Sequence, residues 1–339
     1  MRSLSRILCT LAATAVALAA HAQQPLPKVK FVLEWRYEGQ LAWFMHAKNK
    51  GYYEREGLDV TVDSGTGSGA AINRLVSGAH DMASGDMSSL IEYMGNNPGP
   101  TRLQAVYLMY NESPSVIFTL KKNGIASPKD LVGKKISAPS FDATRRQFPI
   151  FAAAVGIDPK AVTFLSVDPA LRETMLARGQ ADAATGYNLN RHTYGALGVK
   201  DEELVAFKFT DYKVKLYGSS ILASTRFINE NPKAVAAFVR ATNRALIDTI
   251  ANPAEAVKAV KAFDPVINER LELEKLKDIL TTIDTPFSRA NGLGAISKLD
   301  LENQVDAVSA AYGIKNKPNA DLIFNSSFLP PRAERQPNR

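Results

Sequence analysis

The stretch that decides the fold is GLDVTVDSGTGSGAAINRLV, residues 57–76. From Leu58 to Val62 apolar and polar residues alternate, and this period of two is typical of a strand with one buried face. From Ile72 to Val76 the apolar residues are spaced i, i+3, i+4, so they form one face of a helix. Glycines and hydroxyl residues fill the loop between them, residues 64–69, which we call the Gly/Ser corner. The stretch therefore predicts a strand, a corner with unusual dihedrals and a helix.

The Gly/Ser corner predicts one wall of a ligand site. The first turn of a helix leaves backbone N–H groups without partners, and such groups attract anions and carbonyl oxygens. We therefore take Gly67, Ser68, Gly69 and Ala70 as candidate ligand-binding residues. In the alternative interpretation, the glycines only turn the chain and Ser68 caps the helix. The glycines do not follow G-x-G-x-x-G and no Gly-Lys-Ser/Thr follows, so a dinucleotide or P-loop site is not indicated.

The N-terminus, residues 1–22, has the pattern of a secretion signal. Arg2 and Arg6 precede a nearly continuous apolar run from Ile7 to Ala20, and a small-x-small site ends at Ala22. The run is too short for a transmembrane helix. We therefore expect export through the Sec pathway, cleavage after Ala22 and a periplasmic location.

The composition argues against several classes of function. The single cysteine is Cys9, inside the predicted signal, so we expect no disulfide, thiol nucleophile or cysteine metal ligand in the rest of the chain. Loss of the two signal arginines lowers the formal net charge from +7 to +5, and no basic run is interleaved with aromatics, so nucleic acid is not an expected partner. The remaining histidines, His46, His80 and His192, are scattered and no H-E-x-x-H is present. We expect no metal, no cofactor and no enzyme activity, although sequence alone does not exclude a Ser-His-Asp triad.

Strand and helix patterns alternate twice along the chain, which predicts an α/β protein with two doubly wound lobes. Lobe 1 is expected to comprise residues 28–113 and 217–329, and lobe 2 residues 114–216. Two strands would then cross the hinge between the lobes. Ligands of open α/β sheets bind beyond the carboxyl ends of the strands, so the lobes should enclose a cleft that can close. Residues 330–339 are polar and rich in proline, and we expect a disordered tail there.

Several segments resemble one protein family. They are residues 44–60 (FMHAKNKGYYEREGLDV), the Gly/Ser corner, GAHDMA at 78–83, LVGKKI at 131–136, GIDP at 156–159, GQADA at 179–183 and Asn231-Pro232. In this order they resemble the periplasmic solute-binding proteins of ABC importers of the nitrate/sulfonate/taurine class, and most closely the branch that binds thiamine-pyrimidine precursors. The resemblance implies a type II periplasmic-binding fold, a monomer without catalytic activity, and delivery of a small-molecule ligand to an inner-membrane permease with its ATPase.

Two other functions stay open at this point. A related eukaryotic branch makes the thiamine pyrimidine with a lysine-bound pyridoxal cofactor and a cysteine-rich motif, and this chain departs from it because its only cysteine is Cys9. This departure argues against a pyrimidine-synthase-like enzyme, although His46, Lys48 and Lys50 are present. Such an enzyme is the alternative function. A ligand-sensing module that presents its closed form to a receptor is the third possibility.

Strand ends of lobe 1 supply further candidate residues. Trp35 and Tyr37 follow the first strand, and the resemblance places a ligand-contacting aromatic there, whereas Trp35 could instead fill the core. Asp86 ends the third strand and could accept from a ligand N–H or cap the following helix. Asn111 lies at the first hinge crossing.

Lobe 2 repeats the pattern of a strand, a polar loop and a helix at residues 135–155. Arg145 or Arg146 could hold a carboxylate or sulfonate with two hydrogen bonds, or pair with a carboxylate in a solvated turn. The lobe 2 candidates are Ser140, Asp142, Arg145, Tyr187 and Asn188, and Tyr217 is added at the returning crossover. The predicted ligand is a small anionic or planar solute, such as a sulfonate, an aromatic carboxylate, a pyrimidine or a nitrate-like anion.

Overall fold

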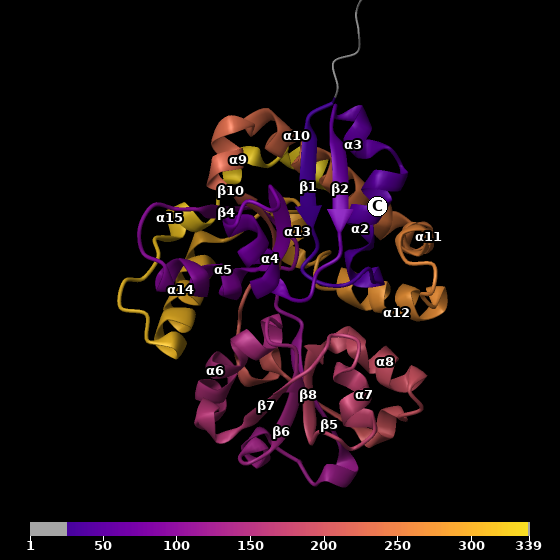
Figure 1. The fold of residues 1–339 in the computed structure, drawn as a ribbon, viewed down its shortest axis with the longest axis vertical. Coiled ribbons are helices and arrows are strands. Elements are labelled where there is room, and N and C mark those ends of the chain that lie inside the picture. Colours follow the sequence, from indigo (N-terminus) through magenta and orange to yellow (C-terminus); the bar gives the residue numbers. More distant parts are fainter. Residues whose placement is uncertain (1–25, 338–339) are drawn as a thin grey trace, which may run out of the picture.

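A computed structural model describes residues 26–337, and the predicted signal peptide lies outside the described residues. Two α/β lobes are stacked one above the other, and each is built on a five-stranded sheet. Figure 1 shows lobe 1 at the top, with the N-terminal strands and most of the C-terminal helices, and lobe 2 below it. The predicted two-lobed α/β fold is confirmed.

The sheet of lobe 1 has the strand order β2-β1-β3-β10-β4. Strand β1 runs parallel to β2 and β3, and β10 runs antiparallel to both β3 and β4. The bounds are β1 Lys28–Val32, β2 Asp59–Asp63, β3 Met82–Asp86, β4 Leu103–Leu108 and β10 Ser219–Ser224.

The sheet of lobe 2 has the order β7-β6-β8-β5-β9 and follows the same plan. Strand β6 is parallel to β7 and β8, and β5 is antiparallel to β8 and β9. The bounds are β5 Ser115–Leu120, β6 Lys135–Ala138, β7 Thr163–Ser166, β8 Ala183–Tyr187 and β9 Leu204–Lys208.

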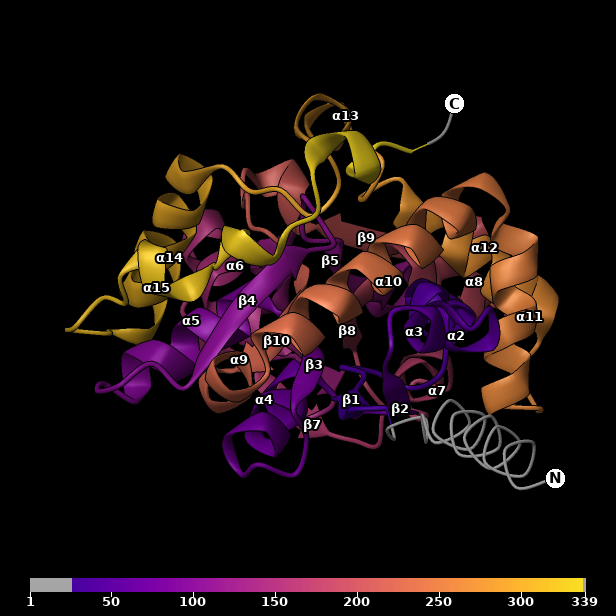
Figure 2. The same ribbon diagram turned by 90° about the horizontal axis from the view of Figure 1, so that it is seen from above.

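Helices cover both sheets. In Figure 2, which looks down on lobe 1, α10 lies across the sheet, α11 and α12 gather at one end and α14 and α15 at the other. The helices of lobe 1 are α2 Ala42–Asn49, α3 Tyr52–Arg55, α4 Ser68–Val76, α5 Met87–Asn96, α9 Thr225–Glu230, α10 Pro232–Ala251, α11 Pro253–Phe263, α12 Glu269–Leu280, α13 Pro286–Asn291, α14 Lys298–Tyr312 and α15 Ala320–Ile323. Those of lobe 2 are α6 Ala143–Val155, α7 Arg172–Ala177 and α8 Arg191–Ala196. Among the described residues, none of these helices has the length and apolar character that crossing a bilayer requires.

The Gly/Ser corner folds as its sequence predicts, with β2 before it and α4 after it. A Cβ at Gly65 would lie 1.8 Å from the carbonyl oxygen of Leu33, so only glycine lets the corner lie against the end of β1. The backbone of Gly67 has φ +132° and its N–H donates to the carbonyl of Glu34 at 2.7 Å. The corner is thereby fastened to the residues that follow β1.

The chain crosses between the lobes twice, through residues 109–114 and 209–218. The crossings lie outside the assigned strands, yet they pair by backbone hydrogen bonds. Ser113 N–H donates to the carbonyl of Leu216 at 2.7 Å, and Gly218 N–H to that of Tyr110 at 3.1 Å. These antiparallel pairs form the hinge.

The two lobes contact each other on both sides of the hinge. Helix α6 of lobe 2 packs on α5 and α14 of lobe 1, and α8 packs on α12. Arg146 pairs with Glu92 across the first contact at 2.6 Å, and His192 with Asp278 across the second at 3.0 Å. Between these contacts Gly69 N–H donates to the carbonyl of Phe141 at 3.3 Å. The lobes are therefore closed on each other.

The predicted disordered tail is wrong for residues 330–337. A short 3₁₀ helix, Arg332–Arg335, packs on lobe 1, and the Arg335 side chain is buried. Its Nε donates to the carbonyl of Pro330 at 2.7 Å, and Asn243 donates to the carbonyl of Glu334 at 2.8 Å. Polar composition suggested disorder, but these contacts with distant residues order the segment.

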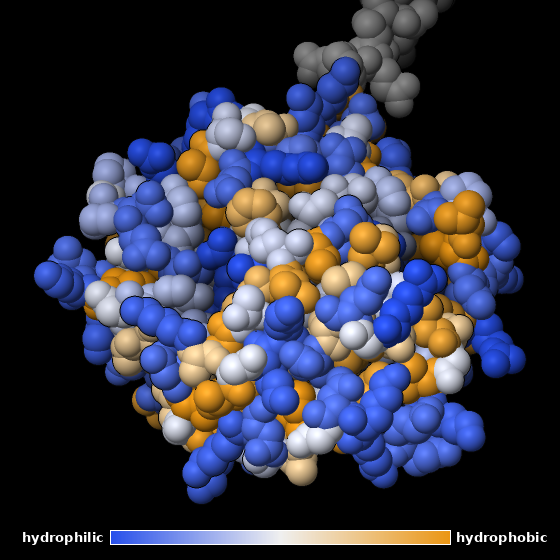
Figure 3. All heavy atoms as spheres, turned by 60° about the horizontal axis from the view of Figure 1, so that its bottom comes forward, coloured by the Kyte–Doolittle hydropathy of each residue, from blue (hydrophilic) through white to orange (hydrophobic). Residues whose placement is uncertain are grey.

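The outer face of lobe 2 is mostly hydrophilic with separate apolar patches, as Figure 3 shows. The large apolar side chains exposed on this lobe include Val132, Leu171 and Leu197. Scattered apolar residues of this kind are normal on a protein surface.

Candidate functional site

A small cavity lies between the lobes where strand ends of both sheets meet. Its volume is about 20 Å³, which is room for about one water molecule, so a larger solute can enter only when the lobes open. Larger hollows of about 180 and 800 Å³ lie beside the hinge and along α10, but neither includes the Gly/Ser corner. The cavity is lined by Glu34, Trp35, Gln40, Gly67, Ser68, Asp142, Ala143, Arg172, Tyr187 and Asn190.

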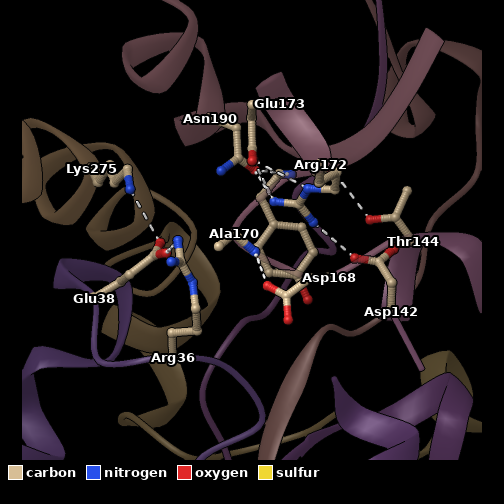
Figure 4. A network of polar contacts seen from close by, with 12 residues as sticks. Arg36, Glu38, Asp142, Thr144, Asp168, Ala170, Arg172, Glu173, Asn190 and Lys275 are labelled. Carbon is tan, nitrogen blue, oxygen red and sulfur yellow. Dashed lines mark hydrogen bonds and ion pairs between the residues drawn. The ribbon is translucent and has the colours of Figure 1, made fainter. Parts of the chain in front are cut away.

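Trp35 and Arg172 face each other across this cavity. The Arg172 guanidinium lies over the indole ring, 4.7 Å from its centroid, and both side chains are buried. Arg172 also pairs with Asp142 Oδ2 at 2.8 Å and with Glu173 Oε1 at 2.7 Å, as Figure 4 shows. Burial opposes the charged form, but Glu173 and Asp142 outweigh it and raise the pKa of Arg172. The guanidinium is therefore a fixed cation whose charge its neighbours already neutralise.

Glu34, which the sequence analysis missed, is at the centre of the lobe 1 wall. Ser68 Oγ donates to Glu34 Oε2 at 2.7 Å, and Ser219 donates to the other carboxyl oxygen. Burial raises the pKa of Glu34 despite these hydrogen bonds. Ser68 does not cap α4, because Gly67 occupies the N-cap position. A carboxylate directly before Trp35 at the end of a strand was the signal that could have identified Glu34.

Asp86 lies behind the cavity and joins the lobes. Its Oδ1 accepts from Ser89 N–H at 3.1 Å, so the capping alternative is confirmed. Its Oδ2 accepts from Gln147 Nε2 of lobe 2 at 2.8 Å. Burial, together with the nearby charge of Glu34, raises the pKa of Asp86 to about 8.

Of the two neighbouring arginines, Arg146 reaches the other lobe and Arg145 does not, and a ligand contact of Arg145 stays a prediction. Arg145 bonds Ala138 O at 3.3 Å and Ser166 Oγ at 2.9 Å, both within lobe 2. Arg146 lies against Gly69, where an added Cβ would be 2.8 Å from its Nε. Adjacent helix positions point about 100° apart, so only one of the two can face lobe 1.

Three further predicted residues lie away from the cavity because their side chains turn into lobe 1. Tyr37 donates to the carbonyl of Val62 at 2.9 Å, and its ring packs on Phe263. Tyr217 accepts from Ser297 N–H at 2.8 Å. Asn111 Oδ1 accepts from Thr285 Oγ1 at 3.2 Å.

The other predicted residues are nearer but do not line the cavity. Asn188 lines the hollow beside the hinge, because the chain bends into a 3₁₀ turn after β8. Ser140 is exposed, and Gly69 and Ala70 lie on the α4 side of the corner. The cavity therefore brings together five predicted residues, namely Trp35, Gly67, Ser68, Asp142 and Tyr187. A ligand contact at each of them stays a prediction.

Gly67→Ala is expected to hold the lobes apart. The new Cβ would lie 2.3 Å from the carbonyl oxygen of Phe141 in lobe 2, so the closed arrangement cannot form unless one corner moves. Small-angle scattering should show a larger radius of gyration than in the wild type. Gly57→Ala is the matched control, because its φ of +77° is also unfavourable for alanine but nothing lies within 4 Å of the new Cβ. Equal radii for Gly67→Ala and wild type would contradict the prediction.

The cavity has no spare positive charge for an anion. Arg172, the one cationic side chain among the lining residues, pairs with two carboxylates, while Glu34 and Asp142 are themselves acidic. Among the described residues no group of three or more His, Cys, Asp and Glu side chains is placed to hold a metal ion. The walls thus offer hydrogen-bond acceptors and aromatic faces.

Several known proteins are similar to this chain in sequence or in fold. A formylaminopyrimidine-binding protein of Halalkalibacterium halodurans is 26% identical over 84% of this chain and 86% of its own, and the riboflavin-binding protein RibY of Chloroflexus aurantiacus is 26% identical over 94% and 91%. A 4-amino-5-hydroxymethyl-2-methylpyrimidine phosphate synthase of Schizosaccharomyces pombe is 22% identical over 74% and 73%. The solved alkanesulfonate-binding protein SsuA of Xanthomonas axonopodis pv. citri superposes with a TM-score of 0.68 at 14% identity, over 88% of this chain and 98% of that one, and shows the fold alone.

The family model described as NMT1/THI5 like matches residues 39–256. The match includes the Gly/Ser corner, α6 and Arg172, so it reaches both walls of the cavity, and it begins after Glu34 and Trp35. The resemblance that the sequence indicated is confirmed at this level, and the chain belongs to the NMT1/THI5-like family.

Proposed function

We propose that this protein is the periplasmic solute-binding component of an ABC importer, and that it captures a neutral, planar nitrogen heterocycle of the pyrimidine type between its lobes. The observation that carries the proposal is the cavity where strand ends of two α/β lobes meet, with Trp35 on one wall and Tyr187 on the other. The protein would be exported by the Sec pathway, cleaved after Ala22, and act as a monomer that delivers its solute to a permease with its ATPase.

The charges of the cavity favour a neutral heterocycle over a sulfonate or a nitrate-like anion. An anion would need an unpaired cation, and Arg172 is already bound by Asp142 and Glu173. An amino-substituted pyrimidine carries N–H groups that can donate to the carboxyl oxygens of Glu34, and a flat ring that can stack on Trp35. The name of the formylaminopyrimidine-binding relative supports the same class.

The synthase alternative has less support. The relatives with 26% identity are named as binding proteins, and the synthase relative is 22% identical over a smaller share of the chain. The cavity, moreover, presents carboxyl groups, an arginine and aromatic rings, but no lysine that could hold a pyridoxal cofactor.

Binding of a formylaminopyrimidine is expected to change the fluorescence of Trp35. The chain has two tryptophans, and Trp43 is buried in the lobe 1 core, so Trp43→Phe leaves Trp35 as the only reporter. Titration of this variant should give a saturating change, and the solute at 100 times its Kd should add about 2.7 kcal/mol to the free energy of unfolding. Nitrate and an alkanesulfonate should give neither effect.

Trp35→Phe is the matched control, because it keeps only the core tryptophan and should lose the signal. A saturating response to the alkanesulfonate with none to the pyrimidine would refute the proposed ligand class. Absence of any response from all three solutes, in fluorescence and in thermal stability, would refute the proposed site.

A further inference from the structure

Closing of the lobes buries two carboxyl groups that have no cationic partner among residues 26–337. Asp86 ends β3, Glu34 lies two residues beyond the end of the neighbouring strand β1, and both side chains are almost completely buried. Ser68 links them, since its hydroxyl donates to Glu34 Oε2 at 2.7 Å and accepts from Asp86 N–H at 3.1 Å. Each carboxyl raises the cost of ionising the other, because like charges in a desolvated site repel.

The two arginines near this pair are already neutralised by other acids. Arg172 of α7 pairs with Asp142 and Glu173, and Arg146 of α6 pairs with Glu92 of α5 at 2.6 Å. Asp142 itself adds negative charge near Glu34 and raises its pKa further. The other titratable groups facing the pair are phenols, Tyr110 before the hinge, Tyr187 at the end of β8 and Tyr312 on α14, and burial raises their pKa well out of the physiological range.

Lobe 2 supplies the cover that keeps water away from both carboxyls. Gln147 of α6 donates to Asp86 Oδ2 at 2.8 Å, and Ser113 at the hinge donates to the amide oxygen of Gln147 at 2.8 Å. Asp142 and Tyr187 face Glu34 across the cavity. When the lobes open, these side chains withdraw with lobe 2, while the partners in lobe 1, Ser68, Ser89 and Ser219, stay in place.

We propose that closing of the lobes takes up a proton at the Glu34–Asp86 pair, so that solute capture is coupled to proton uptake. The closed form favours protonation of one carboxyl of the pair, because two unpaired negative charges are costly in a desolvated site, and the open form lets water solvate both as carboxylates. The solute half of this statement, that solute capture is coupled to proton uptake, rests on the function proposed above. The closure half, that closing of the lobes takes up a proton, does not.

The direction of the pH dependence follows from the raised pKa of Asp86. A carboxyl whose pKa is about 8 when covered and near its usual 3.8 when solvated binds more protons in the closed form. The equilibrium constant for closing is therefore highest at low pH, falls by up to tenfold per pH unit between about pH 4 and pH 8, and levels off above. Affinity for the solute should follow the same curve, because closing on a bound solute should also cover both carboxyls with lobe 2, with the lobes slightly farther apart than in the solute-free form described above.

The closure half is tested by small-angle scattering of the solute-free protein from pH 5 to pH 9.5. We expect the wild type to expand as the pH rises and Asp86→Asn to stay compact, because asparagine keeps the cap on α5 and cannot ionise. Asp86→Ser provides a second neutral cap if the amide variant fails to fold. Asp158→Asn is the matched control, since Asp158 caps an exposed 3₁₀ turn of lobe 2, and this variant should behave as the wild type.

A wild-type radius of gyration that does not change over this pH range would overturn the proposal, as would the same expansion in wild type and in both neutral variants. The solute half is tested by calorimetry of a formylaminopyrimidine at pH 7 in buffers of different ionisation enthalpy. Wild type should take up more protons per bound solute than Asp86→Asn, by up to one and by less where the solute-free protein is already closed, and equal uptake overturns the coupling. If no solute binds, the proposed function fails while the scattering result still decides the closure.

Discussion

Replacing Arg172 by methionine is expected to lower the free energy of unfolding by about 3–5 kcal/mol and to abolish solute binding. Arg172 holds Asp142 at 2.8 Å and Glu173 at 2.7 Å, and all three side chains are buried. Methionine would fill much of the same space but would leave two desolvated carboxylates without their cation, which is the costly way to break a buried pair. Urea unfolding followed by circular dichroism measures the loss.

Arg145→Met is the control for this prediction. Arg145 is also an arginine of lobe 2 that lies over an aromatic ring, Phe164, but it is partly exposed and pairs with no carboxylate. Arg145→Met should lower the free energy of unfolding by less than about 1.5 kcal/mol, which is the scale of ordinary hydrogen bonds. If the two variants are equally stable, Arg172 does not have the structural role assigned to it.

The second large effect is expected for Lys275→Met. Lys275 of α12 donates to Glu38 Oε2 at 3.2 Å, as Figure 4 shows, and to Glu272 Oε1 at 3.0 Å. All three side chains are buried. Glu272 in turn accepts from Gly39 N–H at 2.6 Å, so the network holds the loop that carries Trp35. Lys275→Met should lower the free energy of unfolding by about 3 kcal/mol. This is at the lower end for a broken buried pair, because Glu38 keeps Arg36 as a partner.

Lys277→Met gives a matched comparison on the same helix. Lys277 also pairs with the glutamate three residues before it, Glu274, at 2.9 Å, but both side chains are about half exposed. An exposed pair of this kind contributes about 0.3–0.5 kcal/mol. Lys275→Met should in addition weaken the fluorescence response of Trp35 to the solute, whereas Lys277→Met should not. Equal costs for the two lysines would contradict the prediction.

Local periodicity was sufficient to predict the fold. The alternation over residues 58–62 placed β2 within a residue of its observed bounds, and the helical spacing over 72–76 matches the C-terminal end of α4, which begins four residues earlier, at Ser68. The return of the chain near Tyr217 was predicted, and β10 begins two residues later. Each of these patterns depends on which face of an element is buried, and a single sequence records that directly.

The site was harder to predict because it depends on how the lobes meet. Arg172 is the first residue of α7, and nothing in its sequence neighbours indicates that it would stack on Trp35 of the other lobe. Arg145 and Arg146 are equivalent in sequence, and the packing of α6 on α5 alone decides between them. Contacts between lobes join residues far apart in the chain, which no local pattern encodes.

The hinge also has a consequence for how the polypeptide acquires its fold. Strand β10 is the only strand between β3 and β4, and it is made after the whole of the second sheet, residues 115–208. A chain that emerges N-terminus first can therefore complete its second sheet while the first still lacks the strand that joins β3 to β4. Pairing of strands that are far apart in the sequence is slow, so insertion of β10 should be the late step of folding. A chaperone that protects the unfinished first sheet would act before that step.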